Sequence, residues 1–101
     1  MSGLTQQEIE RLALLAEELA ESIQVVGKIL RHGYESVNPL ASNPTTNRYD
    51  LHKELGDVKA AIHLMQANKD LDEKCISDFE RDKLRRLPRW LHNEHDGVHR
   101  F

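Results

Sequence analysis

The sequence is poor in the features that build disulfides, membrane spans and basic binding faces. Cys75 is the only cysteine among its 101 residues, so it has no intrachain disulfide and no cysteine-based zinc site. No apolar run approaches the ~18–20 residues that a membrane-spanning helix requires. The formal net charge of −3 gives no electrostatic case for nucleic-acid binding, which needs a basic face. These absences predict a globular chain that binds neither a membrane nor a nucleic acid.

The N-terminus and the chain length limit the location and the number of domains. MSGLTQQEIE lacks the basic and apolar regions of a secretory signal, and the single cysteine fits a reducing compartment, so we expect a cytoplasmic protein. A chain of 101 residues is enough for one small domain and not for two. Because a small domain buries a modest fraction of its surface, a partner subunit is expected.

Hydrophobic periodicity predicts three helices and no strand. The pattern Thr5-Gln-Gln-Glu8 is a capping box that opens the first helix, and Gly33 is its candidate C-cap. The fold class is therefore all-α, a bundle of three main helices per chain that is completed by oligomerisation. The helical segments cover about 5–31, 48–67 and 70–86.

The remaining segments are predicted to form a loop and a tail. Residues 33–50 contain two prolines and many Asn, Ser and Thr, which indicates a long loop. Asp70 is the candidate N-cap of the third helix, and Pro88 stops it. Residues 88–101 form a tail, so the ordered core of the single domain 1–101 is expected over about 5–87.

Two conspicuous features are expected to carry no chemistry. Three tail histidines at helical spacing would bind a transition metal if they lay on a helix, but Gly97 interrupts the run, which favours a solvated tail. Cys75 is expected to be a buried small apolar residue and not a nucleophile. The tail histidines are His92, His95 and His99.

Each of the two long helices carries two stripes of residues at helical spacing. In the first helix the second stripe lies about 120–180° from the main apolar stripe, at ~100° per residue. Helices of this kind are predicted to be packed on two sides. The main stripes are Ile9, Leu12, Ala16, Leu19, Ile23, Val26 and Leu30, and then Leu51, Leu55, Val58, Ile62 and Met65. The second stripes are Leu14, Glu18, Glu21, Val25 and Lys28, and then Glu54, Asp57, Ala61, Leu64 and Asn68.

The second stripe of each helix contains a pair of carboxylates three residues apart. Glu18 and Glu21 form the first pair, and Glu54 and Asp57 form the second. Like charges at this spacing repel each other, and buried charges are usually paired or bind metal. Four carboxylates without Cys or His suit a hard cation, Mg²⁺ or its substitute Mn²⁺. Glutamate pairs on helices are also commonly solvated, so a charged surface is the alternative.

These pairs and their flanking residues resemble the signature of the MazG-like nucleotide pyrophosphohydrolases, in the all-α NTP pyrophosphatase superfamily. LLAEELAES looks like the first motif helix and KELGDVKAAIHLM like the second. The resemblance covers most of residues 5–87, more loosely in the third helix. It implies an Mg²⁺-dependent enzyme that cleaves nucleoside triphosphates between the α and β phosphates, giving monophosphate and pyrophosphate. It also implies a homodimer or a homotetramer.

The resemblance assigns roles to individual residues. Glu18, Glu21, Glu54 and Asp57 would be the metal ligands. Glu17 would orient water or the ligand shell, which completes a set of five catalytic acids. A di-iron carboxylate site is disfavoured, because no glutamate has a histidine three residues further on.

Basic and polar side chains are needed to hold the substrate phosphates. The carboxylate-bearing stripes nominate Lys28 and Asn68 for substrate binding, and Arg31 is close to Lys28. Lys83 and Arg86 are also candidates, because the family that the chain resembles often places basic residues on its last helix. Lys83 is equally well explained as a lysine that extends its amine to solvent, and Asn68 is better explained as a helix C-terminus.

The segment between the two motifs departs from the family pattern because it is longer than usual. This segment can cover the nucleotide, with Arg48 or Tyr34 reaching phosphate or base, or it can form a subunit contact. It also keeps a second interpretation open, in which the chain is a catalytically silent, oligomeric helical protein that binds a partner.

Overall fold

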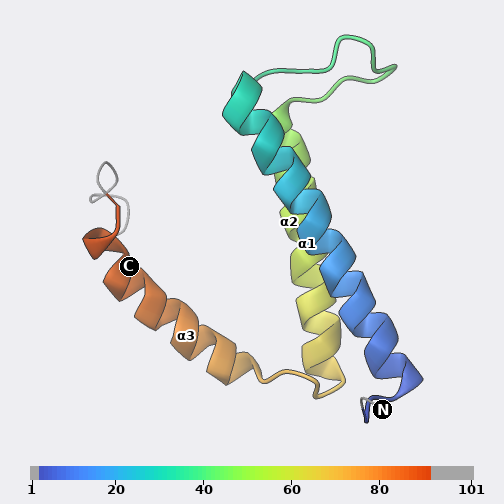
Figure 1. Ribbon diagram of the computed structural model, residues 1–101, viewed down its shortest axis with the longest axis vertical. Helices are drawn as coiled ribbons and strands as arrows, with labels where there is room; N and C mark the ends of the chain where they lie inside the picture. Colours follow the sequence, from blue (N-terminus) through green and yellow to red (C-terminus); the bar gives the residue numbers. More distant parts are fainter. Residues whose placement is uncertain (1–2, 92–101) are drawn as a thin grey trace.

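A computed structural model describes residues 3–91 as three α-helices and a short 3-10 helix (Figure 1). These elements confirm the predicted all-α class, and no strand occurs within residues 3–91. No helix in this range combines the length and the apolar character needed to cross a bilayer. The elements are α1 Gln6–His32, α2 Asn47–Ala67, α3 Glu73–Arg86 and η1 Leu87–Arg89.

The caps of α1 follow the sequence prediction. Thr5 Oγ1 accepts a hydrogen bond from the Glu8 N–H at 3.1 Å, and the Glu8 carboxylate accepts one from the Thr5 N–H at 2.8 Å. At the other end the Gly33 N–H donates to the Ile29 carbonyl at 2.7 Å, with a φ of +92°. This positive φ suits glycine, which has no Cβ.

Helices α1 and α2 pack side by side as an antiparallel hairpin that contains the small core (Figure 1). No large side chain among the described residues is completely buried, so this core is thin. Ala61 and Met65 are its most deeply buried members. The buried residues are Ser22 and Val25 of α1, with Asn47, Val58, Ala61 and Met65 of α2.

The main apolar stripe of α1 does not face α2. Ile23 is 71% exposed and Leu30 is 82% exposed, and the other large members of the stripe are exposed as well. The contact with α2 uses the second stripe instead, where Val25 is buried and Glu18 is half-buried. The strongest apolar stripe of the chain is therefore left uncovered by residues 3–91.

Helix α2 buries a face that lies between its two predicted stripes. Val58 and Met65 come from the main stripe and Ala61 comes from the second. Leu55 and Leu64, one from each stripe, point outward. A helix of 3.6 residues per turn places positions 58, 61 and 65 on one face, and this face meets α1.

Helix α3 leaves the hairpin and projects to one side of it (Figure 1). The radius of gyration is 16.9 Å, against about 13 Å for a compact chain of 100 residues. The three helices thus do not close into a bundle within one chain. Completion of the bundle by further chains stays a prediction.

Two expectations about the start of α3 are wrong. Asp72, and not Asp70, is the N-cap, since its carboxylate accepts a hydrogen bond from the Cys75 N–H at 2.9 Å. Asp70 instead accepts two hydrogen bonds from the Arg11 guanidinium, at 2.5 and 3.0 Å, which join the turn after α2 to α1. Cys75 is exposed, because the first turn of α3 does not pack on the hairpin.

The loop between α1 and α2 spans residues 33–46 and is shorter than predicted. Helix α2 starts early because the Thr46 hydroxyl caps it, accepting from the Tyr49 N–H at 3.1 Å. Val37 and Thr46 form an isolated bridge that closes the base of the loop. The predicted tail histidines, His92, His95 and His99, lie outside the described residues.

Candidate metal centre

The four predicted metal ligands converge from the two helices of the hairpin. Glu18 and Glu21 are one turn apart on α1, and Glu54 and Asp57 are one turn apart on α2. Antiparallel packing sets the two pairs against each other, and one oxygen from each carboxylate lies within 4.8 Å of the others. All four residues are half-buried. We call these four residues the carboxylate cluster.

Small residues beside the cluster allow the two helices to approach. Ser22 and Ala61 are buried next to the acidic pairs. The Ser22 hydroxyl donates to the Glu18 carbonyl at 3.0 Å, so this buried polar group is satisfied within its own helix.

Two oxygen atoms in the cluster are buried without a hydrogen-bond partner. They are Glu18 Oε2 and Glu54 Oε2, and the side chain of Glu54 is only 13% exposed. Leaving a buried carboxylate oxygen unpaired is costly, and here each one also faces carboxylates of the same sign. A bound cation would remove both penalties.

The crowding raises the pKa of two of the carboxyl groups. Burial is the largest cause for Glu18, followed by the charges of Asp57 and Glu17. A hydrogen bond with the Glu54 carboxyl is the largest cause of the raised pKa of Glu21, followed by burial and by the charge of Glu18. Both shifts show that the ionised cluster is unfavourable without a compensating charge.

Lys53 is a cation near the cluster that the sequence analysis missed. Its Nζ lies 3.4 Å from Glu54 Oε1 and 3.7 Å from Asp57 Oδ2, and the hydrogen bond to Glu54 raises the pKa of the lysine. The spacing of four between Lys53 and Asp57 could have revealed this pair. The lysine is 61% exposed and contributes one charge against four, so most of the repulsion remains.

The donor set of the cluster fits a hard divalent cation. It offers four carboxylate groups and no histidine or cysteine, which is the chemistry of Mg²⁺ and Mn²⁺ sites. No family model, curated protein or solved structure matches this chain. The candidate centre therefore rests on its own residues and geometry.

Glu17 and Asn68 lie outside the carboxylate cluster. Glu17 is exposed, and it acts on the cluster only through its charge. Asn68 is at the C-cap of α2, about 16 Å along the helix from Asp57 at ~1.5 Å per residue. Its side-chain N–H donates to the Leu64 carbonyl at 2.8 Å, which is the helix-terminal role that the sequence favoured.

Lys83 and Arg86 are on α3, away from the hairpin (Figure 1). Both are exposed, and Arg86 Nε lies 3.2 Å from a carboxylate oxygen of Asp82 on its own helix. Within one chain the structure does not bring them to the cluster.

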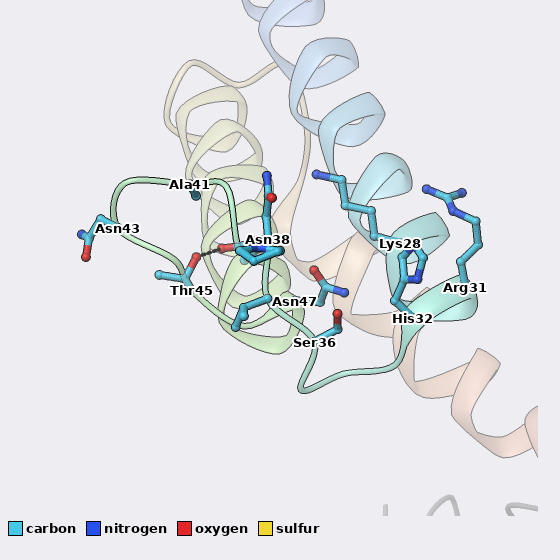
Figure 2. Close-up of a pocket in the computed structure, with 12 residues that line it drawn as sticks. Lys28, Arg31, His32, Ser36, Asn38, Ala41, Asn43, Thr45 and Asn47 are labelled. Atoms are coloured by element: carbon cyan, nitrogen blue, oxygen red, sulfur yellow. Dashed lines mark hydrogen bonds between the residues drawn. The ribbon is translucent and has the colours of Figure 1, made fainter.

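The other two basic candidates, Lys28 and Arg31, line a cavity of about 600 Å³ (Figure 2). The cavity lies among the last turns of α1, the 33–46 loop and the start of α2. Neither Arg48 nor Tyr34 lines the cavity. These two residues instead contact each other, with the Arg48 guanidinium 4.2 Å from the centre of the Tyr34 ring.

Proposed function

We propose that this chain is a MazG-like, Mg²⁺-dependent nucleoside triphosphate pyrophosphohydrolase that acts in the cytoplasm. It would cleave between the α and β phosphates and release nucleoside monophosphate and pyrophosphate. The observation that carries the proposal is the carboxylate cluster with its two buried, unpartnered oxygens. The motif resemblance supports it independently, because it selects the same four residues.

The metal ion, its four ligands and Glu17 would have different roles in the reaction. Mg²⁺, when bound, would neutralise phosphate charge and polarise the α-phosphate for attack by water. Glu18, Glu21, Glu54 and Asp57 would hold it from both helices. Glu17 is exposed beside Glu18, where its carboxylate would orient the attacking water.

We further propose that the active unit is a homodimer or a homotetramer. The exposed main stripe of α1 and the open shape of the chain support this, because an uncovered apolar stripe of this length normally marks an interface. Exposed Phe79 and Trp90, on and after α3, extend the apolar surface beyond the hairpin.

The same exposed stripe favours a second candidate function, a catalytically silent helical protein that binds a partner. In that case the carboxylates would be only a charged face of the hairpin. The two candidates differ in whether the cluster binds metal and supports turnover, and this difference can be measured directly.

A pyrophosphate-release screen tests the proposal. Common and modified nucleoside triphosphates would be incubated with Mg²⁺ or Mn²⁺ and the wild type, Glu21→Gln, Asp57→Asn or the control Glu80→Gln, a substitution at an exposed position of α3. We expect metal-dependent formation of monophosphate and pyrophosphate. Loss of a ligand should lower the rate at least ~100-fold, since removing a group that only orients a metal ligand already costs about 10–100-fold.

The control variant should retain full activity. Absence of turnover on every nucleotide, together with no effect of metal on thermal stability, would refute the enzyme proposal. It would leave the partner-binding function as the better account of the exposed stripe.

A further inference from the structure

The cavity beside the carboxylate cluster has an excess of basic groups on its wall (Figure 2). Lys28, Arg31 and His32 line it from α1. Among the described lining residues only Asp50 carries a carboxylate, and this group accepts a hydrogen bond from the Thr45 hydroxyl at 2.5 Å. Lys28 and Arg31 form no ion pair with any described residue. The cavity therefore has cationic charge available for an anion.

The opposite wall supplies neutral polar groups. Asn38 Oδ1 accepts from the Leu40 N–H at 3.0 Å, which leaves the Asn38 side-chain N–H donors available. Asn47 is buried, and its side-chain N–H donates to the Gly33 carbonyl at 3.1 Å, which fixes it between the loop and α2. No Phe, Tyr or Trp lines the cavity, and the imidazole of His32 is the one aromatic ring among its described lining residues. Its chemistry matches phosphate better than a nucleobase.

The cavity and the cluster lie along the same hairpin. Lys28 is two turns beyond Glu21 on α1, about 10 Å at ~1.5 Å per residue. Asp50 is about one turn before Glu54 on α2. Helical side chains tilt toward the N-terminus of their helix, and Figure 2 shows Lys28 extending from α1 toward the N-terminal side, back along the direction of the cluster. The terminal phosphates of a polyphosphate held at the cluster would therefore extend toward the cavity.

We infer that this cavity binds the terminal phosphates of the substrate, through Lys28, Arg31 and the Asn38 amide. The inference rests on the proposed function for the identity of that substrate, but binding of a phosphate anion here does not require the metal. Holding the terminal phosphates would fix the α-phosphate over the cluster. It would also make the site select triphosphates over monophosphates, since a monophosphate cannot reach both places.

Calorimetric titration of the metal-free protein with inorganic pyrophosphate, at constant ionic strength, tests the inference. The key variant is Lys28→Ala/Arg31→Ala, and its control, Lys59→Ala/Arg85→Ala, removes the same charge from exposed positions outside the cavity. We expect saturable binding to the wild type and to the control. The key variant should bind at least ~10-fold more weakly, and Asn38→Ala should also weaken binding, because both remove charge-assisted hydrogen bonds.

The cluster variant Glu21→Gln/Asp57→Asn separates this inference from the proposed function. It should bind metal-free pyrophosphate at least as tightly as the wild type, because it removes negative charge near the anion. Absence of binding to the wild type, or equal losses in the key variant and its control, would overturn the cavity assignment even if hydrolysis is found. Binding that depends on Lys28 and Arg31 without any hydrolysis would retain the cavity and reject the enzyme.

Discussion

The acidic residues of the cluster destabilise the fold that carries them. Burial raises the pKa of Glu18, and contact with Glu54 raises that of Glu21. A carboxyl group whose pKa is higher in the folded chain than in the unfolded chain opposes folding once the pH exceeds its unfolded value. This effect is absent in acid, develops as the pH rises through the range between the two values and remains at neutral pH. Two such groups, in a cluster of four carboxylates, are therefore better explained by binding than by stability.

At the residue scale, we predict that Glu18→Gln and Glu21→Gln each raise the Tm of the metal-free protein at pH 7 by a few degrees. The amide removes a charge that the fold disfavours, so the gain should vanish below about pH 4, where carboxyl groups are protonated in both states. Mg²⁺ should raise the Tm of the wild type more than that of either variant. Thermal melts between pH 3.5 and 8, with and without Mg²⁺, measure both effects.

Glu80→Gln on α3 is the matched control for these melts, because Glu80 is exposed and outside the cluster. Its Tm should follow the wild type at every pH. If the cluster variants were less stable than the wild type in metal-free neutral buffer, the acids would be engaged in favourable contacts, and the metal-centre assignment would lose its physical basis.

Among the helices, two glycines differ in whether the backbone conformation requires a glycine. Gly56 lies in the middle of α2, where a Cβ would meet nothing within 4 Å and no turn requires glycine. Gly33 ends α1 at φ +92° and ψ 166°, a conformation that is essentially restricted to glycine. A Cβ at Gly33 would also meet no neighbour within 4 Å, so its constraint is the backbone conformation and not space.

We predict that Gly56→Ala stabilises the chain by about 0.5–1 kcal/mol, because alanine is the better helix former. Gly33→Ala should destabilise it by about 1–3 kcal/mol, the range of such backbone strain. Urea unfolding followed by circular dichroism measures the free energy of unfolding of the wild type and of both variants. Each variant serves as the control for the other. Destabilisation by Gly56→Ala would show that another chain packs closely against α2 at this point.

In the whole molecule, the described residues include many exposed large apolar side chains and few buried ones. The main stripe of α1 is uncovered, and α3 projects from the hairpin without closing over it. A second copy of the chain is the occupant that the proposed oligomer requires. Packing on the stripe would place α1 between two neighbours, which is the two-sided arrangement that its two stripes predict.

We predict that Ile23→Glu dissociates the oligomer. Ile23 is 71% exposed within one chain and lies in the middle of the main stripe, so a buried charge there would be costly. The control is Gln24→Glu, which adds the same charge at the neighbouring exposed position, off the stripe. Light scattering after size-exclusion chromatography should give two or four chains for the wild type and the control, and one chain for Ile23→Glu. A monomeric wild type at micromolar concentration would contradict the oligomer.

The sequence predicted what depends on neighbours along the chain. The capping box at Thr5, the glycine stop at Gly33 and the three helices follow from local hydrogen bonds and periodicity, and all are confirmed. The meeting of the four acids was also predictable, because the pairs occupy interior positions on two helices joined by a loop. The cap at Asp72 was missed, because Asp70 is an equally good cap by residue type.

Which faces of these helices meet became known from the packing of the folded chain. Periodicity locates the stripes on α1, but it cannot say that the second stripe covers α2 while the main one stays exposed, since that choice depends on packing between distant segments. The same holds for the Arg11–Asp70 pair, which joins residues 59 positions apart in the sequence. The positions of the helices and of the acids that they carry follow from the order of residues alone. The packing of α1 on α2 brought the acids within 4.8 Å of one another and enclosed two of their oxygens, which is the physical basis of the proposed cation site.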